Sequence, residues 1–333
     1  MGPDPNSINI ATPLQSTSPL AIAHRGGAGL RPENTLAAFR HAVTLGMDGI
    51  ELDLQLSRDG IAMVHHDEHL DPAHTRGPDG QWLETPGPAL RERTAAEIAA
   101  YDVGRAKPGT AYHARFPELT PVDGATIPTF GDVLGLIAQE APPRFHLLVE
   151  LKTPLLRPFS EADCAQLAAA ALADIDRAGL RRTCRFVSFD WRTLGAAKHL
   201  APDIPAAHTT LAFAAVSPTS NLPSDVSETA KRLRESNLAG APWYGSADWR
   251  GMTGGSYGEK LLRAMAADGA TQWLAFHEDV TWETAEIAHA LGLSIAAWTV
   301  DDASEMRRLA DLGVAAILSD RPDRLKTVLQ ELT

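Results

Sequence analysis

The sequence predicts a single α/β domain, a TIM (β/α)8 barrel with an inserted segment after an early strand. Short apolar runs alternate with stretches of helical periodicity along most of the chain, a pattern typical of βα units around a parallel sheet. The length of 333 residues is sufficient for such a barrel together with insertions. Several of the apolar runs end in charged or histidine side chains, and the carboxyl ends of the strands are where a barrel assembles its chemistry.

The segment 1–18 is rich in Pro, Ser, Thr and Asn and predicts a flexible leader ahead of a barrel domain over 19–333. The first 24 residues contain no Lys or Arg and no continuous apolar run, so no secretory signal is expected. This favours a soluble, cytoplasmic protein, with a periplasmic or secreted location as the alternative. The two cysteines, Cys164 and Cys184, are too few for a disulfide framework or a Cys-ligated zinc site.

Nine segments are expected to be strands, because each is short and apolar and is followed by polar or turn-forming residues. In chain order they are 20–23, 49–54, 61–64, 145–151, 185–189, 204–208, 272–276, 294–300 and 315–318. We also expect that one barrel strand lies in the irregular region 212–258.

Helices are expected between most of these strands. The first begins after Asn34 or Thr35 as a cap and carries apolar residues at helical spacing. The later helices are expected at 162–178, 281–291, 303–312 and 323–332. The segment 68–127 interrupts this rhythm, because it is rich in Pro, Gly and charge and holds at most a short helix near 94–101. It is therefore interpreted as an insertion of the kind that usually decorates a site.

The overall charge argues against two classes of partner. Lys plus Arg total 30 against 42 Asp plus Glu, which gives a formal net charge of −12. A chain this acidic repels nucleic acid and anionic lipid at long range. No apolar run approaches the roughly 20 residues needed to cross a bilayer. We therefore expect no nucleic acid partner and no stable membrane insertion, and a phosphate-bearing substrate would need a local cluster of cations.

The predicted strand 49–54 places two carboxylates side by side. Its apolar residues alternate with Glu51 and Asp53, so these two side chains share one face of the strand. Inside a barrel such a pair is too costly to keep unless a cation neutralises it. Glu150 lies near the end of the strand 145–151, and three carboxylates suit one hard divalent cation such as Ca²⁺ or Mg²⁺.

Histidines and cations fall at the same strand ends. A single residue of this kind is more often a solvated or packing residue, but the coincidence of several at one end of a barrel indicates a catalytic cluster. His65 is expected to support the site or face away from it, because adjacent strand residues point to opposite sides. Together with the three carboxylates, the cluster contains His24, Arg25, His66 and Lys152.

Two other motifs lack the sequence context that their usual functions require. Gly26, Gly27 and Gly29 are spaced like a dinucleotide-binding loop, but Pro32 stands where the third glycine of that fingerprint belongs. The string Gly-Gly-Ser-Tyr-Gly at 254–258 matches a nucleophile elbow, yet no apolar strand precedes it. The sequence therefore argues against a nicotinamide-dependent enzyme and against a serine hydrolase.

A series of short motifs extends over nearly the whole chain from about residue 20. They are Ala-His-Arg-Gly-Gly at 23–27, Pro-Glu-Asn-Thr at 32–35, Glu-Leu-Asp at 51–53, Asp-Gly at 59–60, His-Asp at 66–67, Glu-Leu-Lys at 150–152, Ser-Phe at 188–189, Trp-Thr-Val at 298–300 and Ser-Asp-Arg-Pro at 319–322. In this combination they resemble the glycerophosphodiester phosphodiesterase family. The segment 68–127 is similar to the insertion that marks barrels of that family.

The resemblance implies hydrolysis of glycerophosphodiesters, such as glycerophosphocholine or glycerophosphoethanolamine, to sn-glycerol 3-phosphate and an alcohol. It implies one divalent cation, Ca²⁺ or Mg²⁺, and a small-molecule partner, and it leaves the oligomeric state open. The implied roles are metal binding by Glu51, Asp53 and Glu150, general acid and base catalysis by His24 and His66, and phosphate binding by Arg25 and Lys152. Trp298, at the end of a late predicted strand, is a candidate wall of the substrate pocket, although an inward Trp in a barrel serves equally often for packing.

Two other functions stay open. A lysophospholipase D-like phosphodiesterase on the same barrel would need an apolar rim for an acyl chain, and the insertion is the place to look for it. A catalytically silent binding module would keep the fold and use the insertion for partners, but it would not require both histidines.

Overall fold

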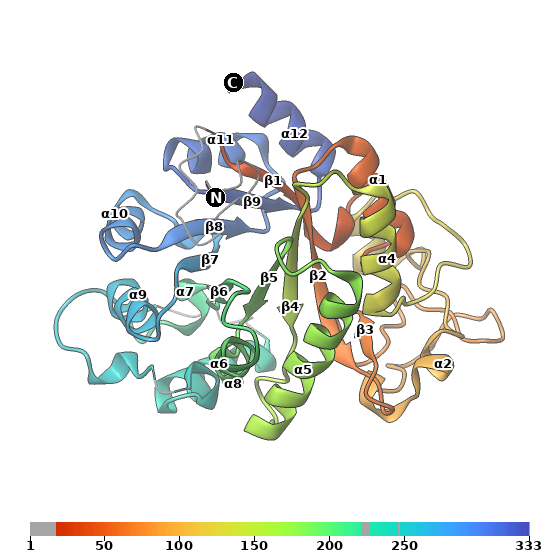
Figure 1. Ribbon diagram of the computed structural model, residues 1–333, viewed down its shortest axis with the longest axis horizontal. Coiled ribbons are helices and arrows are strands. Elements are labelled where there is room, and N and C mark those ends of the chain that lie inside the picture. The colour runs from red at the N-terminus through yellow and green to blue at the C-terminus, as the bar shows by residue number, and fades with distance from the viewer. Residues whose placement is uncertain (1–17, 221–226, 246, 333) are drawn as a thin grey trace, which may run out of the picture.

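The structure, a computed structural model, describes residues 18–220, 227–245 and 247–332. Eight parallel strands close into a barrel with helices on its outside (Figure 1), so the predicted TIM-barrel fold is confirmed. All of the expected leader 1–18 except Ser18 lies outside the described residues. Within the described ranges, no helix is long and apolar enough to cross a membrane.

Short strands form the barrel wall. They are β1 (Leu20–Ala23), β2 (Gly49–Leu56), β4 (His146–Leu151), β5 (Cys184–Ser188), β6 (Ala206–Thr209), β7 (Gln272–Phe276), β8 (Ser294–Trp298) and β9 (Ala316–Ser319). Their order around the ring is β1-β9-β8-β7-β6-β5-β4-β2, and a pairing between β1 and β2 closes it. The C-terminal part of the chain thus lies beside the N-terminal part, with Ala23 opposite Ser319.

A ninth strand, β3 (Ala62–Val64), lies outside the ring. It follows a tight turn in which Gly60 has a φ of 78°, and this turn returns the chain antiparallel to the end of β2. The expectation of a barrel strand in 212–258 is wrong for the part of that region that the structure describes. It forms α7 (Phe213–Val216), α8 (Glu228–Ala239) and single 3-10 turns, because the other predicted strands already complete the ring.

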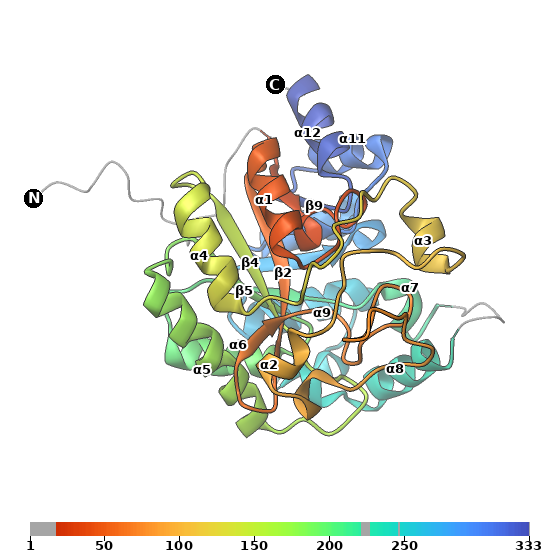
Figure 2. The same ribbon diagram turned by 90° about the vertical axis from the view of Figure 1, so that its right-hand side faces the viewer.

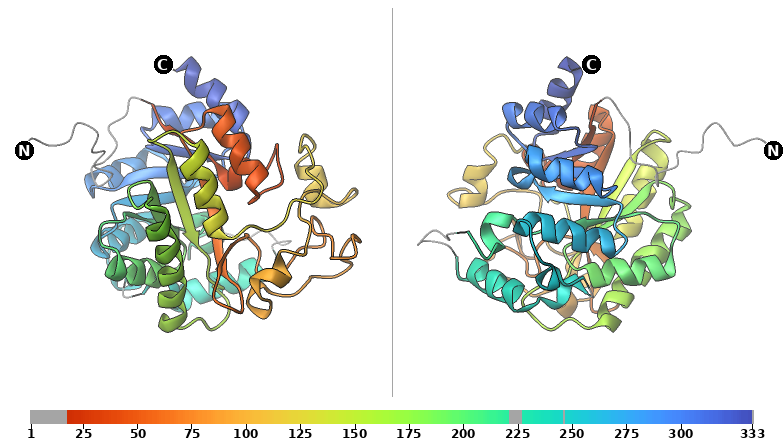
Figure 3. Two further views of the ribbon diagram at one scale, coloured as in Figure 1. Left: turned by 45° about the vertical axis from the view of Figure 1, so that its right-hand side comes forward. Right: turned by 90° about the vertical axis from the view of Figure 1, so that its left-hand side faces the viewer.

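Helices connect most of the strands and cover the outside of the barrel (Figure 3). They begin where the sequence supplies caps: the Thr35 side chain accepts from the backbone N–H of Ala38 at the start of the first helix, and Gly46 ends that helix in the left-handed region. The longer helices are α1 (Leu36–Leu45), α4 (Phe130–Glu140), α5 (Glu161–Ala178), α6 (Trp191–Leu200), α9 (Tyr257–Ala267), α10 (Trp282–Ala290), α11 (Ala303–Asp311) and α12 (Pro322–Glu331).

The core is divided by the wall of the barrel. Ile50, Leu52 and Leu54 of β2 belong to the large hydrophobic cluster between strands and helices, whereas a smaller cluster fills the barrel interior. Because successive residues of a strand point to opposite faces, Glu51 and Asp53 are turned into the barrel. The apolar alternation of β2 is therefore what places two carboxylates inside the protein.

The segment 68–127 lies along one side of the barrel, in orange to yellow in Figure 2. It contains the short helices α2 (Ala95–Ile98) and α3 (Ala111–Arg115) and a 3-10 turn at Leu90–Glu92. A small hydrophobic cluster of its own joins it to β3, through Met63 on the strand and side chains such as Leu90 in the segment.

Candidate active site

Three carboxylates meet at the carboxyl end of neighbouring strands. Asp53 of β2 lies opposite Glu150 of β4 in the sheet register, and Glu51 lies two residues earlier on the same face of β2. One oxygen of each of the three carboxylates lies within 4.8 Å of the others. Glu51 and Asp53 are almost fully buried, and no hydrogen bond reaches Asp53 Oδ1 from any described residue. An all-oxygen donor set with a buried oxygen that accepts no hydrogen bond fits a divalent cation.

The pKa values of Glu51 and Asp53 also indicate a cation between these side chains. Burial and the neighbouring Asp53 raise the pKa of Glu51 to about 8. Burial also disfavours the charged form of Asp53, but Arg25 and His66 outweigh it and hold the pKa of Asp53 well below its usual range. Asp53 is thus ionised beside the protein's own cations. Glu51 needs further positive charge nearby to ionise at neutral pH.

Two cations lie against these carboxylates. Arg25 Nε is 3.4 Å from Asp53 Oδ2, and the backbone N–H of Arg25 donates to Glu51 Oε2 at 3.2 Å. Lys152 Nζ lies 3.0 Å from Glu150 Oε1 and 3.6 Å from Asp53 Oδ1. The structure therefore brings the two predicted cations and the three predicted carboxylates into one cluster.

The turn that carries Arg25 has an unusual backbone. Arg25 and Asn34 have φ values of 51° and 55°, in the left-handed region that side-chain-bearing residues rarely adopt. Between them, Gly26 sits so close to α1 that a Cβ would lie 2.7 Å from the Cβ of Ala38. Asn34 uses its side chain to donate to Asp53 Oδ2 at 2.7 Å, which explains a polar residue at this strained position.

His24 is held by a residue from the other end of the chain. Its Nδ1 lies 2.7 Å from Asp320 Oδ1, directly after β9, and its Nε2 lies 3.8 Å from Glu51 Oε2. Burial would lower the pKa of His24, but Asp320 outweighs burial and raises it. A carboxylate on Nδ1 fixes the ring so that Nε2 faces the carboxylates of β2.

His66 has a similar partner close by in sequence. Its Nδ1 lies 2.7 Å from Asp67 Oδ1, and the side chain is 31% exposed. The Nε2 of Gln55 donates to the carbonyl oxygens of His65, His66 and Asp67, which holds this stretch of backbone against β2. His65 is buried instead, and burial lowers its pKa to about 4, with a contribution from His74.

Trp298, at the end of β8, belongs to an aromatic group. Its ring meets Phe189 edge to face at 5.4 Å between centroids and meets Phe276 at 5.6 Å. Lys152 Nζ lies 6.0 Å from the centroid of the Phe189 ring, so this aromatic group adjoins the charged cluster. The indole Nε1 of Trp298 is buried, and the described part of the chain supplies no hydrogen-bond partner for it.

A cavity of about 510 Å³ adjoins the cluster. His66 and Lys152 contribute to its wall, and the remaining residues come from the end of β2, from the segment around 89–92 and from the connection between β4 and α5. The lining combines apolar residues such as Phe159 with several charged side chains, including Arg91. The cavity is therefore polar enough for a hydrophilic group.

The sequence analysis gave no role in the site to several residues that hold it. Asn34, Glu33, Asp67 and Asp320 lie within the recognised motifs, next to residues that it singled out, so their position in those motifs was an available signal. Glu33 accepts from Arg25 Nη1 at 2.9 Å, and Arg25 outweighs burial to lower the pKa of Glu33 to about 2. Residues of the segment 68–127 also reach the site, but no periodicity could have indicated them.

Comparisons with known proteins are consistent with this geometry. Residues 24–324 match the model of the glycerophosphoryl diester phosphodiesterase family. A glycerophosphodiester phosphodiesterase from Bacillus altitudinis is 38% identical over 136 residues, which make up 41% of this chain and 46% of that relative. The alignment thus spans about half the length of that relative.

Two solved structures share the fold. A crystal structure from Silicibacter pomeroyi DSS-3, whose description as a glycerophosphoryl diester phosphodiesterase is provisional, is 33% identical, with a TM-score of 0.76 over 95% of this chain and 94% of that one. A phosphodiesterase from Oleispira antarctica, solved with the product sn-glycerol-3-phosphate, is 22% identical, with a TM-score of 0.64 over 94% of this chain and 97% of that one.

Proposed function

Because the chain belongs to the glycerophosphoryl diester phosphodiesterase family, we propose that it hydrolyses glycerophosphodiesters to sn-glycerol 3-phosphate and an alcohol. The observation that carries the proposal is the cluster of three carboxylates, two cations and two histidines at one end of the barrel. The product bound by the Oleispira antarctica phosphodiesterase is the one expected from this reaction.

Glu51, Asp53 and Glu150 are proposed to hold one divalent cation. Carboxylate oxygens favour Ca²⁺ or Mg²⁺. The raised pKa of Glu51 and the lack of a hydrogen bond from any described residue to the buried Asp53 Oδ1 support a cation between these side chains. When bound, such an ion supplies positive charge to a phosphoryl oxygen.

Arg25 and Lys152 are proposed to bind the phosphate. A phosphodiester carries one negative charge, and more charge collects on its oxygens as the bond to the leaving group breaks. A planar guanidinium beside one oxygen of Asp53 and a flexible ammonium beside the other can both contact the phosphate oxygens. They also supply the local positive charge that an acidic protein needs to attract such a substrate.

His24 and His66 are proposed as the general acid and base pair. In each, an aspartate on Nδ1 leaves Nε2 for proton transfer, and histidine titrates near neutral pH. One imidazole takes the proton from the attacking hydroxyl of the glycerol, and the other protonates the leaving alkoxide. The cyclic phosphate that forms is then opened by water.

The cavity beside His66 has a mixed lining, with charged residues such as Arg91 and Asp163 and apolar residues such as Phe159. Its charged side chains suit a hydrophilic alcohol. Trp298 and its aromatic neighbours, which adjoin Lys152, are proposed to form a wall of the substrate site, against the apolar face of the glycerol.

The test is release of sn-glycerol 3-phosphate from glycerophosphocholine, followed with a coupled dehydrogenase after EDTA treatment and re-addition of Ca²⁺ or Mg²⁺. We expect metal-restored turnover, and a loss of about 100-fold or more in His24→Ala and Glu51→Ala. Glu283→Ala, at an exposed position of α10, serves as the matched control. Folded, metal-loaded protein that releases no product from any glycerophosphodiester would refute the assignment.

A further inference from the structure

Two predicted site residues, His66 and Arg25, are joined by contacts that pass through the segment 68–127. The route leads from His66 through Asp67 to His74, and from His74 through Tyr112 and Glu33 to Arg25. His74 and Tyr112 both belong to the segment 68–127, which sequence reasoning treated only as a decoration of the site.

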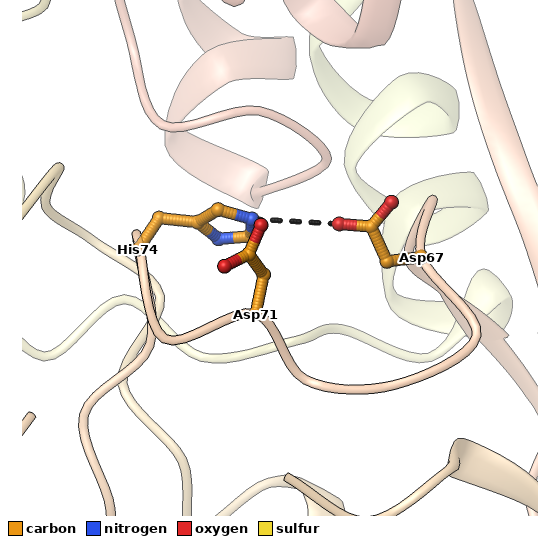
Figure 4. Close-up of side chains that lie close together, drawn as sticks. All are labelled: Asp67, Asp71 and His74. Atoms are coloured by element: carbon orange, nitrogen blue, oxygen red, sulfur yellow. Dashed lines mark ion pairs between the residues drawn. The ribbon is translucent and has the colours of Figure 1, made fainter. Parts of the chain in front are cut away.

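The first half of the route is a carboxylate between two imidazoles. Asp67 Oδ1 lies 2.7 Å from His66 Nδ1, and Asp67 Oδ2 lies 3.7 Å from His74 Nε2. Figure 4 shows the His74 ring pointing at Asp67, with Asp71 beside the ring. His74 is only 5% exposed, so its imidazole has a fixed position from which to hold one oxygen of Asp67.

The charged groups around His74 favour its contact with Asp67. Burial disfavours a protonated His74, but Asp67 and Glu33 outweigh burial and raise its pKa. Asp71 adds to the same effect, and its own carboxylate accepts from the backbone N–H of Ala73 at 2.7 Å, which keeps it at the start of this turn. A cationic His74 attracts Asp67 more strongly than a neutral one.

The second half of the route reaches the predicted phosphate-binding side chain. The rings of His74 and Tyr112 lie 4.7 Å apart between centroids, tilted by 35°. The Tyr112 hydroxyl donates to Glu33 Oε2 at 2.9 Å, and Glu33 Oε1 accepts from Arg25 Nη1 at the same distance. Burial and Glu33 raise the pKa of Tyr112 far above its usual value, so the hydroxyl keeps its proton and remains a donor.

We propose that His74 and Tyr112 are positioning residues of this active site, His74 acting on His66 through Asp67 and Tyr112 acting on Arg25 through Glu33. The inference rests on the proposed phosphodiesterase function. An imidazole that transfers protons must meet the reacting oxygen at hydrogen-bond distance, and small displacements of such a group are costly to the rate. The carboxylate that aligns His66 faces His74 with its other oxygen.

The two residues have separable effects. His74 supports a group that transfers protons, so its loss should lower kcat while substrate binding persists. Tyr112 supports a group that binds phosphate before and during the reaction, so its loss should act mainly on KM. A residue that only packs the insertion would lower stability without this division.

The experiment is steady-state hydrolysis of glycerophosphocholine by the full, metal-loaded chain. We expect His74→Leu to lower kcat about 10-fold or more while KM stays within about twofold of wild type. His74→Gln should recover most of kcat, because its amide N–H group can lie near Asp67 Oδ2 as the imidazole Nε2 does, whereas the shorter His74→Asn should not. Tyr112→Phe keeps the ring and should raise KM about 3-fold or more with little change in kcat.

His113→Leu is the matched control, since His113 is an exposed histidine of the same segment, next to Tyr112 on α3. We expect its kcat and KM to equal those of wild type. A wild-type kcat in folded His74→Leu overturns the proposal for His74, as does an equal fall in His113→Leu. If His74→Leu does not fold, the comparison of Gln with Asn decides, and equal kcat values in those two variants overturn the proposal.

A different result would refute the proposed phosphodiesterase function. Wild-type protein that hydrolyses no glycerophosphodiester refutes the phosphodiesterase assignment itself. If the wild-type protein is active and Tyr112→Phe has an unchanged KM, only the proposed action of Tyr112 on Arg25 is refuted.

Discussion

Single residues of the site combine strain, burial and unequal charge. Glu51 and Asp53 have the same strand, face and burial, yet their carboxyl groups titrate on opposite sides of the usual range. The difference arises because Arg25, His66 and Lys152 outweigh burial at Asp53, whereas burial and the neighbouring Asp53 outweigh the effects of His24 and Arg25 at Glu51. At neutral pH the metal-free protein thus has Asp53 ionised and Glu51 protonated, and a bound cation would favour ionisation of Glu51.

The pKa of Glu51 makes metal binding dependent on pH. With a folded-state pKa raised to about 8 from an ordinary 4.5, the metal-free protein keeps Glu51 protonated at neutral pH, and it loses stability progressively as the pH rises from about 4.5 to about 8. A bound cation removes this loss, because it stabilises the ionised form. We expect Mg²⁺ or Ca²⁺ to raise the melting temperature more at pH about 9 than at pH about 6.

Differential scanning fluorimetry with and without the metal measures this difference. The variant Glu51→Gln, which has no proton to lose, should show a smaller and pH-independent shift. An equal shift of the wild-type protein at both pH values would contradict the account of Glu51.

Asn34 tests the cost of the strained turn. Its φ of 55° is unfavourable for residues with a β-carbon, and its side chain donates to the buried Asp53. Asn34→Ala should lower the free energy of unfolding by about 2–4 kcal/mol, and Asn34→Gly by about 1 kcal/mol less, because glycine adopts this φ without strain. Urea unfolding of both variants gives the comparison. Equal losses would mean that the hydrogen bond to Asp53 accounts for the whole effect.

At the scale of elements, the sequence predicted most of the barrel and the inner face of its key strand. The alternation of Ile50, Leu52 and Leu54 was sufficient to turn Glu51 and Asp53 into the barrel, because only one register buries the apolar set. The strand count went wrong at β3, since three apolar residues after an Asp-Gly turn look the same whether the strand joins the ring or returns as a hairpin.

The contacts of the insertion were beyond prediction for a different reason. Tyr112 and Glu33 are 79 residues apart, and Arg115 and Asp320 are 205 residues apart. Such pairs are set by how an irregular segment folds back over the barrel, and no local periodicity encodes that path. The motif residues of the strand ends could therefore be predicted, whereas their supports from the segment 68–127 could not.

The hairpin of β2 and β3 offers a test at this scale. Gln55 Nε2 donates to three successive carbonyl oxygens, those of His65, His66 and Asp67. Gln55→Ala should lower the free energy of unfolding by about 1–2 kcal/mol and reduce kcat through the displaced His66. Gln55→Glu should be worse than Gln55→Ala in both respects, since a carboxylate repels the three oxygens. Circular dichroism melts and turnover of glycerophosphocholine provide the measurements, and a Glu variant at least as active as the Ala variant would exclude this role.

At the scale of the whole molecule, a net charge of −12 surrounds a site that needs to admit an anion. The closed ring places two cations at one opening, because Arg25 follows β1 and Lys152 follows β4. The long-range field still opposes a substrate of net negative charge.

The repulsion between the acidic protein and an anionic substrate predicts that kcat/KM depends on ionic strength. Raising salt from about 0.01 M to about 0.1 M shortens the screening length roughly threefold, to about 10 Å. We expect kcat/KM for an anionic diester such as glycerophosphoglycerol to rise relative to that for zwitterionic glycerophosphocholine over this range. The ratio of the two values, measured at matched metal concentration, is the readout. A ratio that stays constant would show that the local cations alone govern substrate capture.

The two aspartates that hold the histidines come from very different places. Asp67 adjoins His66, but Asp320 reaches His24 across 296 residues, through the pairing of the last strand with the first. During synthesis, the His66 pair can form soon after Asp67 has left the ribosome, whereas His24 acquires its partner only after Asp320 has emerged. A product of premature termination or of proteolysis that lacks β9 is thus left without a complete pair of aligned histidines, so unfinished copies of the protein should have no phosphodiesterase activity.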